Sequence, residues 1–134
     1  MGLFKSLISD IREANKAEYD KENKLWSLIE NMDLSNKRVE YSIWNDFFGA
    51  KQYKIISPSE DYIIIKSPEP RINVCYYSIS YYKKISNYYP THEFICNIDT
   101  SGLLGYSREA IVNRLVQDLE RRKHISGTNA MDRF

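Results

Sequence analysis

Two cysteines and two histidines are the residues of this chain whose side chains could form a nucleophilic site. Cys75 or Cys96 could be the nucleophile, with His92 as its general base and Asp99 orienting the imidazole. Both cysteines, however, occupy inward positions of segments that alternate like strands, where a cysteine is usually a small buried hydrophobic residue. Nothing in the sequence points to a lowered pKa of either thiol. We therefore expect a protein that is not an enzyme.

The sequence contains no pattern typical of a metal or cofactor site. His92 and His124 are the only histidines, too few for a multi-histidine metal site. The glycines Gly102 and Gly105 are not followed by the Gly-Lys-Ser or Gly-Lys-Thr ending of a phosphate-binding loop. The acidic residues near the N-terminus are spaced as on a solvated helix, not as in a calcium loop. No cofactor and no metal are expected.

Six of the eleven tyrosines form three adjacent pairs between Arg71 and Ile98. If the segment up to about residue 82 is a strand, Tyr77 and Tyr81 face the core while the alternate residues face outward. A surface of tyrosine and serine is the composition that antibody paratopes use, because tyrosine offers rigid contact area and serine offers adaptable hydrogen bonds. The predicted partner-binding residues are Tyr76, Ser78, Ser80, Tyr82, Lys83, Lys84, Tyr88 and Tyr89.

The same residues support an alternative, the binding of single-stranded nucleic acid. Unpaired bases would stack on the tyrosine rings while Lys83 and Lys84 supply positive charge. A second basic group, Arg121 to Lys123, could contact phosphates. The net charge of +1, from 19 basic and 18 acidic residues, provides no global attraction, so any such binding would be local.

The elements that position these residues follow from the spacing of the apolar residues and from the prolines and glycines between the segments. Apolar residues at helical spacing predict one helix or a helix pair over residues 3–32, and a second helix from Ser107 to about Gly127. Residues 38–48 fit a strand or a short helix, and we favour the strand. The tyrosine stretch also fits both, and we favour a strand to about Tyr82 followed by a loop from Lys83 to Pro90. Further strands are predicted at residues 53–57, 62–67 and 94–98, the last with Phe94, Cys96 and Ile98 on one side.

These elements predict an α+β fold with an N-terminal helix or helix pair, a four- to five-stranded antiparallel sheet and a C-terminal helix packed on the sheet. We expect one domain over residues 1–127 and a mobile tail over 128–134. No apolar run reaches the ~20 residues that span a bilayer, so integral membrane association is not expected. Two cysteines and no recognisable leader indicate a reduced, cytoplasmic protein.

The N-terminus carries a compact apolar face and a short pattern, Met1, Gly2 and Ser6, that fits N-myristoylation. This face could dock on the domain's own sheet, on a second copy or on a membrane surface, and a homodimer through the N-terminal helix is therefore one expectation. The apolar residues are Leu3, Phe4, Leu7, Ile8 and Ile11.

The overall expectation is a non-enzymatic protein-binding module that acts by occluding a partner protein. The abundance of isoleucine, lysine, asparagine and tyrosine suggests an AT-rich coding sequence, as is common in low-GC bacteria, their phages and their plasmids. A small accessory, inhibitor or adaptor protein of phage or mobile-element type is the function that we expect from the sequence.

Overall fold

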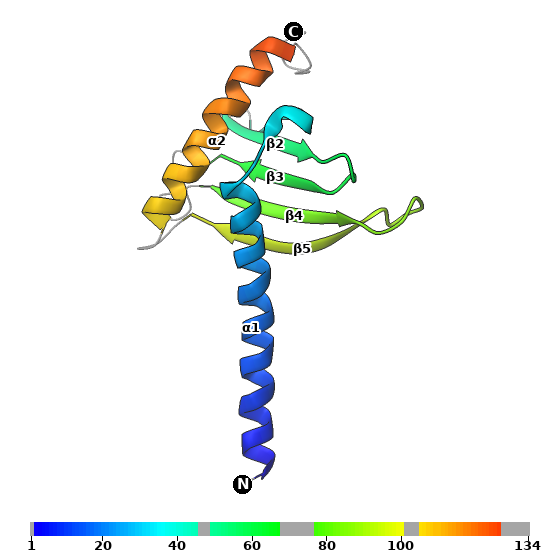
Figure 1. Cartoon of the computed structure of the whole chain (residues 1–134), viewed down its shortest axis with the longest axis vertical. Helices are drawn as coiled ribbons and strands as arrows, with labels where there is room; N and C mark the ends of the chain where they lie inside the picture. Colours follow the sequence, from blue (N-terminus) through cyan, green and yellow to red (C-terminus); the bar gives the residue numbers. More distant parts are fainter. Residues whose placement is uncertain (1, 46–48, 68–76, 101–104, 127–134) are drawn as a thin grey trace.

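The described residues form two α-helices and five strands, and this arrangement confirms the predicted α+β class (Figure 1). The structure is a computed structural model and describes residues 2–45, 49–67, 77–100 and 105–126. The elements are α1 (Gly2–Glu30), a 3₁₀ turn η1 (Leu34–Asn36), β1 (Arg38–Asn45), β2 (Ala50–Ile56), β3 (Tyr62–Lys66), β4 (Ser78–Lys84), β5 (His92–Asp99) and α2 (Gly105–Ser126).

The strands form one antiparallel sheet in the order β1-β2-β3-β4-β5. Cross-strand pairs such as Tyr53 with Ile65 and Ile79 with Ile98 place the apolar residues of alternate positions on the same face. On this inner face Ile65 and Ile79 are completely buried. The period-two alternation in the sequence therefore determines which face of the sheet becomes the core.

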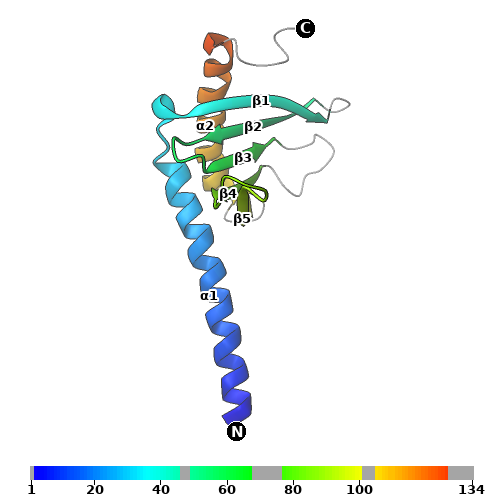
Figure 2. The same ribbon diagram turned by 90° about the vertical axis from the view of Figure 1, so that its right-hand side faces the viewer.

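Both helices cover the inner face of the sheet, and neither covers the outer face (Figures 1 and 2). The core joins Leu25 and Ile29 of α1 with Val112 and Leu119 of α2 and with the inward strand residues. Burying large aliphatic side chains in this way contributes about 1.5–3 kcal/mol each to folding. The outer face has no helix over it in the part of the chain that the structure describes.

Helix α1 is one continuous helix, and its N-terminal half projects away from the sheet (Figure 2). Its 29 residues span about 44 Å at 1.5 Å per residue. Among the described side chains, the buried ones of α1 are Leu25, Trp26 and Ile29, all near the C-terminal end, while residues 15–20 are exposed. Of the two alternatives that the sequence left open, a helix pair and a projecting helix, the projecting helix is found. A homodimer through this helix stays a prediction.

Two ambiguous segments are strands. Residues 38–45 form β1 rather than a helix, because Val39, Tyr41 and Ile43 all reach the core from alternate positions. The tyrosine segment forms β4, which continues to Lys84, two residues further than expected, since Lys83 and Lys84 still pair with β5. Residues 72–76 of the expected tyrosine strand, residues 46–48 at the end of the segment for which we favour a strand, and the tail lie outside the described residues.

Helix α2 begins at Gly105, two residues before the expected start, and the backbone there lies directly against Thr100. Thr100 is fully buried, its hydroxyl accepts a hydrogen bond from the Tyr77 amide at 3.0 Å, and its own amide donates to the Tyr77 carbonyl at 3.1 Å. A Cβ added at Gly105 would lie 1.7 Å from the Thr100 carbonyl oxygen, far inside van der Waals contact. The close approach of the helix to the end of β5 thus requires glycine.

Replacing Gly105 by alanine should reduce the free energy of unfolding by at least about 3 kcal/mol, because helix or strand must move to relieve the overlap. Gly49 provides a matched control: it has φ +67° but no atom within 4 Å of an added Cβ, so Gly49→Ala should cost only about 1–2 kcal/mol. Urea unfolding of both variants measures the difference. Equal costs for the two substitutions would show that α2 does not approach Thr100 this closely.

Candidate functional site

The predicted partner-binding residues are distributed over both faces of β4 and the following turn. Ser78, Ser80 and Tyr82 lie on the outer face, as expected from alternation. Tyr76 lies outside the described residues. Lys83 lies on the opposite, helix-covered side, where it lines a small pocket with Lys21 and Leu25 of α1. The interpretation that Lys83 and Tyr82 share one surface is therefore wrong, for the alternation that turns Tyr82 outward turns Lys83 inward.

The two serines of the outer face are held by internal hydrogen bonds. Both hydroxyls donate to the same oxygen, Asn97 Oδ1, at 3.1 Å from Ser78 and 2.9 Å from Ser80. Asn97 is opposite Ser80 on the neighbouring strand. These side chains form a polar patch, fixed by hydrogen bonds, on the outer face of β4 and the edge strand β5.

Beside this patch, aromatic side chains from three strands form a continuous row on the outer face. The Tyr82 ring stacks on Tyr62 of β3, with centroids 4.8 Å apart, and meets the edge of Phe94 of β5 at 5.6 Å. The His92 ring lies 4.7 Å from Tyr62, and the Lys54 ammonium lies 4.1 Å from the centroid of the same ring. We call Tyr62, Tyr82, Phe94 and His92 the aromatic row.

Phe94 joins the row because β5 contains a bulge. Tyr81 pairs with Cys96 but Tyr82 pairs with Phe94, so Ile95 is an extra residue on β5. The bulge shifts the alternation by one position, and Phe94 becomes 53% exposed while Ile95 packs against the core. The prediction that Phe94 shares a face with Cys96 and Ile98 is therefore wrong. No turn residue or glycine in the sequence marks this bulge.

The turn between β4 and β5 carries the two most exposed large hydrophobic side chains of the described residues, Tyr89 and Tyr88, together with Ile85. Ile85 is 51% exposed, Tyr88 82% and Tyr89 97%. The turn is closed by hydrogen bonds from the Ile85 and Ser86 amides to the Thr91 carbonyl and from the Tyr88 amide to the Ser86 hydroxyl. Figure 1 shows the hairpin extending past the end of β3. We call Ile85, Tyr88 and Tyr89 the hairpin tip.

The base of this hairpin is fastened to the turn between β2 and β3. The Asp61 carboxylate accepts a hydrogen bond from the Lys84 amide at 2.8 Å, and the Lys84 ammonium forms an ion pair with Glu60. This ammonium holds the pKa of the Glu60 carboxyl below its usual value. His92 Nε2 lies 2.7 Å from the Glu60 carbonyl oxygen and donates to it. The turn thereby fixes the direction in which the hairpin leaves the sheet.

Tyr77 and Tyr81, predicted to be core residues, do pack against the core from the inner face. The Tyr77 hydroxyl donates to Asn113 Oδ1 of α2 at 2.5 Å. Burial raises the pKa of both hydroxyls above the ordinary value of 10.0; nearby Glu109 adds to the effect at Tyr77, and Asp61 and Cys96 add to it at Tyr81. These two tyrosines contribute to stability and are not part of the outer face, where Tyr62 and Tyr82 lie.

The residues considered for nucleophilic chemistry do not meet. Cys96 is buried under α1, where its thiol donates to the Lys21 carbonyl at 3.7 Å, and burial raises its pKa. His92 faces the other side, against Tyr62 and Glu60. Cys75 lies outside the described residues, and among those that are described no three His, Cys, Asp or Glu side chains come together as a metal site.

Comparison of the chain with protein-family models, with curated proteins and with solved structures finds no match. Within the described ranges, no helix has the length and apolar character needed to span a membrane. The candidate site accordingly consists of the aromatic row, the serine and asparagine patch beside it, and the hairpin tip.

The raised pKa values of Tyr77 and Tyr81 predict an alkaline loss of stability. Because the folded state disfavours their ionised forms, the stabilisation is complete below the ordinary pKa of 10.0 and decreases as the pH rises past it. Urea unfolding between pH 8 and pH 11 should show this decrease, and Tyr81→Phe should make it smaller. Tyr106→Phe, at an exposed tyrosine of α2, is the matched chemical control. A pH profile unchanged by Tyr81→Phe would contradict the assignment.

Proposed function

We propose that this chain is a non-enzymatic protein-binding module, an accessory, inhibitor or adaptor protein of phage or mobile-element type that occludes the surface of a partner protein. The observation that carries the proposal is the concentration of exposed apolar side chains on one hairpin. Seven large apolar or aromatic side chains of the described residues are exposed, and four of them, Ile85, Tyr88, Tyr89 and Phe94, belong to the β4–β5 hairpin. Contiguous exposed apolar surface of this kind is typical of interaction sites.

The size of a stable interface indicates which further surface must take part. A stable interface buries about 800 Å² on each partner, while one aromatic side chain offers at most about 150–250 Å². With exposed fractions of 82%, 97% and 53%, Tyr88, Tyr89 and Phe94 would provide roughly half to three-quarters of it. The outer sheet face, with Tyr82 and the serine and asparagine patch, is adjacent to Phe94 and would provide the rest. Tyrosine at the centre with polar groups around it is the usual composition of a binding hot spot.

The geometry also favours tight binding over loose contact. The backbone and side-chain bonds at Glu60, Asp61 and His92 hold the base of the hairpin before a partner arrives. Less conformational entropy is then lost on association, which leaves more of the contact energy for affinity.

The proposal predicts that Tyr88→Ala with Tyr89→Ala abolishes binding without affecting the fold, since both rings point into solvent. The measurement is affinity capture from the native host followed by titration calorimetry with the protein recovered, and we expect at least a hundredfold loss of affinity, about 2.7 kcal/mol. Tyr106→Ala, at a tyrosine of α2 that is 69% exposed, is the control and should bind normally. Equal binding by the double variant and the wild type, with circular dichroism unchanged, would refute the proposal.

The second candidate, binding of single-stranded nucleic acid, is favoured by one observation, the Lys54 ammonium over the Tyr62 ring at the end of the aromatic row. Against it, the Lys84 ammonium is paired with Glu60, and Lys83 lies on the other side of the sheet. Each phosphate contact would require an available cation, so the protein partner is the better supported reading.

We therefore expect no binding of labelled single-stranded oligonucleotides, of DNA or RNA, in fluorescence anisotropy at ~50 mM salt, where electrostatic binding is strong. A lysine-to-glutamine change at Lys54 serves as the matched variant. Saturable binding that weakens with salt and with Lys54→Gln would establish the nucleic-acid function in place of the protein-binding one.

A further inference from the structure

The N-terminal half of α1 projects away from the rest of the described chain. Its backbone is helical from Gly2, and it continues beyond the sheet with no other described element beside it (Figures 1 and 2). Among the described side chains of α1, the first that belongs to the core is Leu25. Most helical stability in proteins comes from packing of an apolar face rather than from helix propensity. The projecting half therefore calls for a surface to pack against.

The sequence of this half has the spacing of a coiled coil. Apolar residues recur at alternating intervals of three and four, which are the a and d positions of a heptad repeat. We call these four residues the apolar stripe: Phe4, Leu7, Ile11 and Ala14. The neighbouring positions at Leu3 and Ile8 widen the stripe.

Two charged residues separate the apolar stripe from the part of α1 that packs on the sheet. Glu18 and Lys21 occupy the next two heptad positions, where both are exposed and pair with each other at 3.6 Å. Leu25, at the position after them, is buried in the core. Since the core of the domain uses only the apolar residues beyond this interruption, residues 3–14 have the pattern of a second, separate contact.

The order of large and small residues makes the apolar stripe complementary to itself in the antiparallel direction. When two copies pair antiparallel, Phe4 falls opposite Ala14, and Leu7 falls opposite Ile11. Each layer then combines similar total volumes, as close packing requires. Parallel pairing would instead place two Phe4 rings in one layer and leave a gap between two Ala14 residues.

The position of the sheet also favours the antiparallel direction. A straight helix drifts by about 20° per heptad, so Phe4 and Leu25 differ by only about 60° around α1, and the apolar stripe faces the same side as the sheet. A parallel partner helix on this side would continue into the space of the sheet. In the antiparallel register the second copy ends opposite Lys16, just before the exposed pair of Glu18 and Lys21.

The area and charge of this face fit a reversible contact between two copies. The five large apolar residues of positions 3–11 would bury roughly 400–700 Å² on each copy, slightly less than the about 800 Å² of a standard interface. The charged side chains of the projecting residues balance, two basic and two acidic: Lys5, Arg12, Asp10 and Glu13. Two copies therefore do not repel each other, whereas an anionic membrane would favour a basic helix.

We propose that the chain forms a reversible antiparallel homodimer through residues 3–14 of α1, with Phe4 opposite Ala14 and Leu7 opposite Ile11. The hairpin tip and the outer sheet face take no part in this contact. The dimer is thus independent of the proposed partner and leaves both copies able to bind it.

Sedimentation velocity of the full chain between ~1 μM and ~500 μM tests the dimer, for which we expect a micromolar dissociation constant. Leu7→Glu and Ile11→Lys should each weaken it at least tenfold, because each buries an unpaired charge in two symmetric layers. Ser9→Glu is the control, since it adds a charge about 200° away from both positions and should leave the dimer intact. Urea unfolding at ~1 μM verifies that the domain of each variant stays folded.

Mixing the two disruptive variants tests the antiparallel direction. A heterodimer of the Leu7→Glu and Ile11→Lys chains has one layer with a Glu–Lys pair and one layer with the original Leu–Ile pair. The mixture should therefore dimerise several-fold more tightly than either variant alone. No gain in the mixture would overturn the antiparallel register.

Other occupants of this face are outcomes of the same measurements. A wild-type chain that stays monomeric up to ~500 μM would overturn the proposal, and co-sedimentation of that monomer with phosphatidylglycerol vesicles would make the helix a membrane anchor instead. A dimer that survives Leu7→Glu but is lost in the chain carrying Tyr88→Ala and Tyr89→Ala would place self-association at the hairpin and also overturn it.

Discussion

The constraint on which the rest of this structure depends is that both helices pack on the same face of one sheet. An antiparallel sheet with one face covered must make its other face compatible with water or with a partner. Here that face combines a hydrogen-bonded patch, Ser78, Ser80 and Asn97, with stacked aromatic rings. Tyr81 packs against the core, whereas the next residue, Tyr82, lies on the outer face, so β4 contributes both to stability and to the binding surface that we propose.

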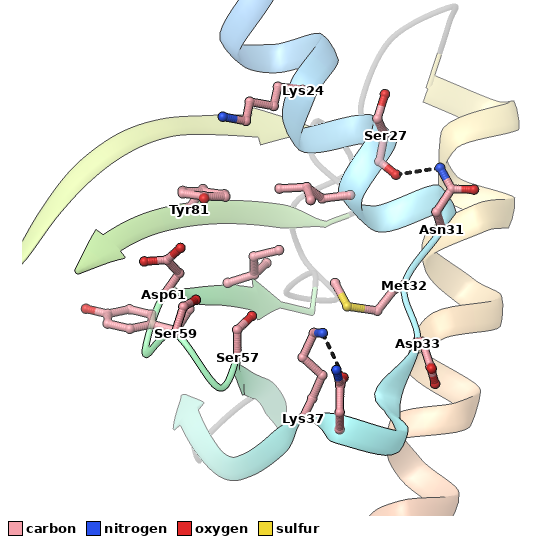
Figure 3. Close-up of a pocket in the computed structure, with 14 residues that line it drawn as sticks. Lys24, Ser27, Asn31, Met32, Asp33, Lys37, Ser57, Ser59, Asp61 and Tyr81 are labelled. Carbon is pink, nitrogen blue, oxygen red and sulfur yellow. Dashed lines mark hydrogen bonds between the residues drawn. The ribbon is translucent and has the colours of Figure 1, made fainter.

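The turn between β2 and β3 lies between the base of the hairpin and a pocket beside the C-terminal end of α1 (Figure 3). On one side, Glu60 and Asp61 hold Lys84 and His92 and so fix the base of the hairpin. On the other side, Asp61 and Ser59 line the pocket under α1. Five residues between two strands therefore position the hairpin tip and one wall of the pocket. A turn of this length would be too mobile for this role without the bonds to Lys84 and His92.

Much of the fold follows from the sequence, because period-two alternation and helical periodicity report directly on which residues are buried. They predict β1, β2, β3 and α2 and the inward orientation of Tyr77, Ile79 and Tyr81. The candidate site is harder to predict from these sequence patterns. Tyr62 joins the aromatic row, with Lys54 over its ring, through the register of three strands. Phe94 joins it through a bulge that no residue type in the sequence predicts. The sequence prediction puts Lys83 on the same surface as Tyr82, because it expects a loop from Lys83 onward where β4 in fact continues.

The central claim is that the β4–β5 hairpin and the outer sheet face form the binding surface. Hydrogen–deuterium exchange of the chain, free and in complex with the protein captured from its host, tests this claim most directly. The account predicts that in the complex the amides of residues 84–92, and those at the ends of β4 and β5 next to this turn, exchange more slowly. The exchange rates of α2 should be unchanged. Protection confined to α1 or α2, with the hairpin exchanging as in the free chain, would contradict it.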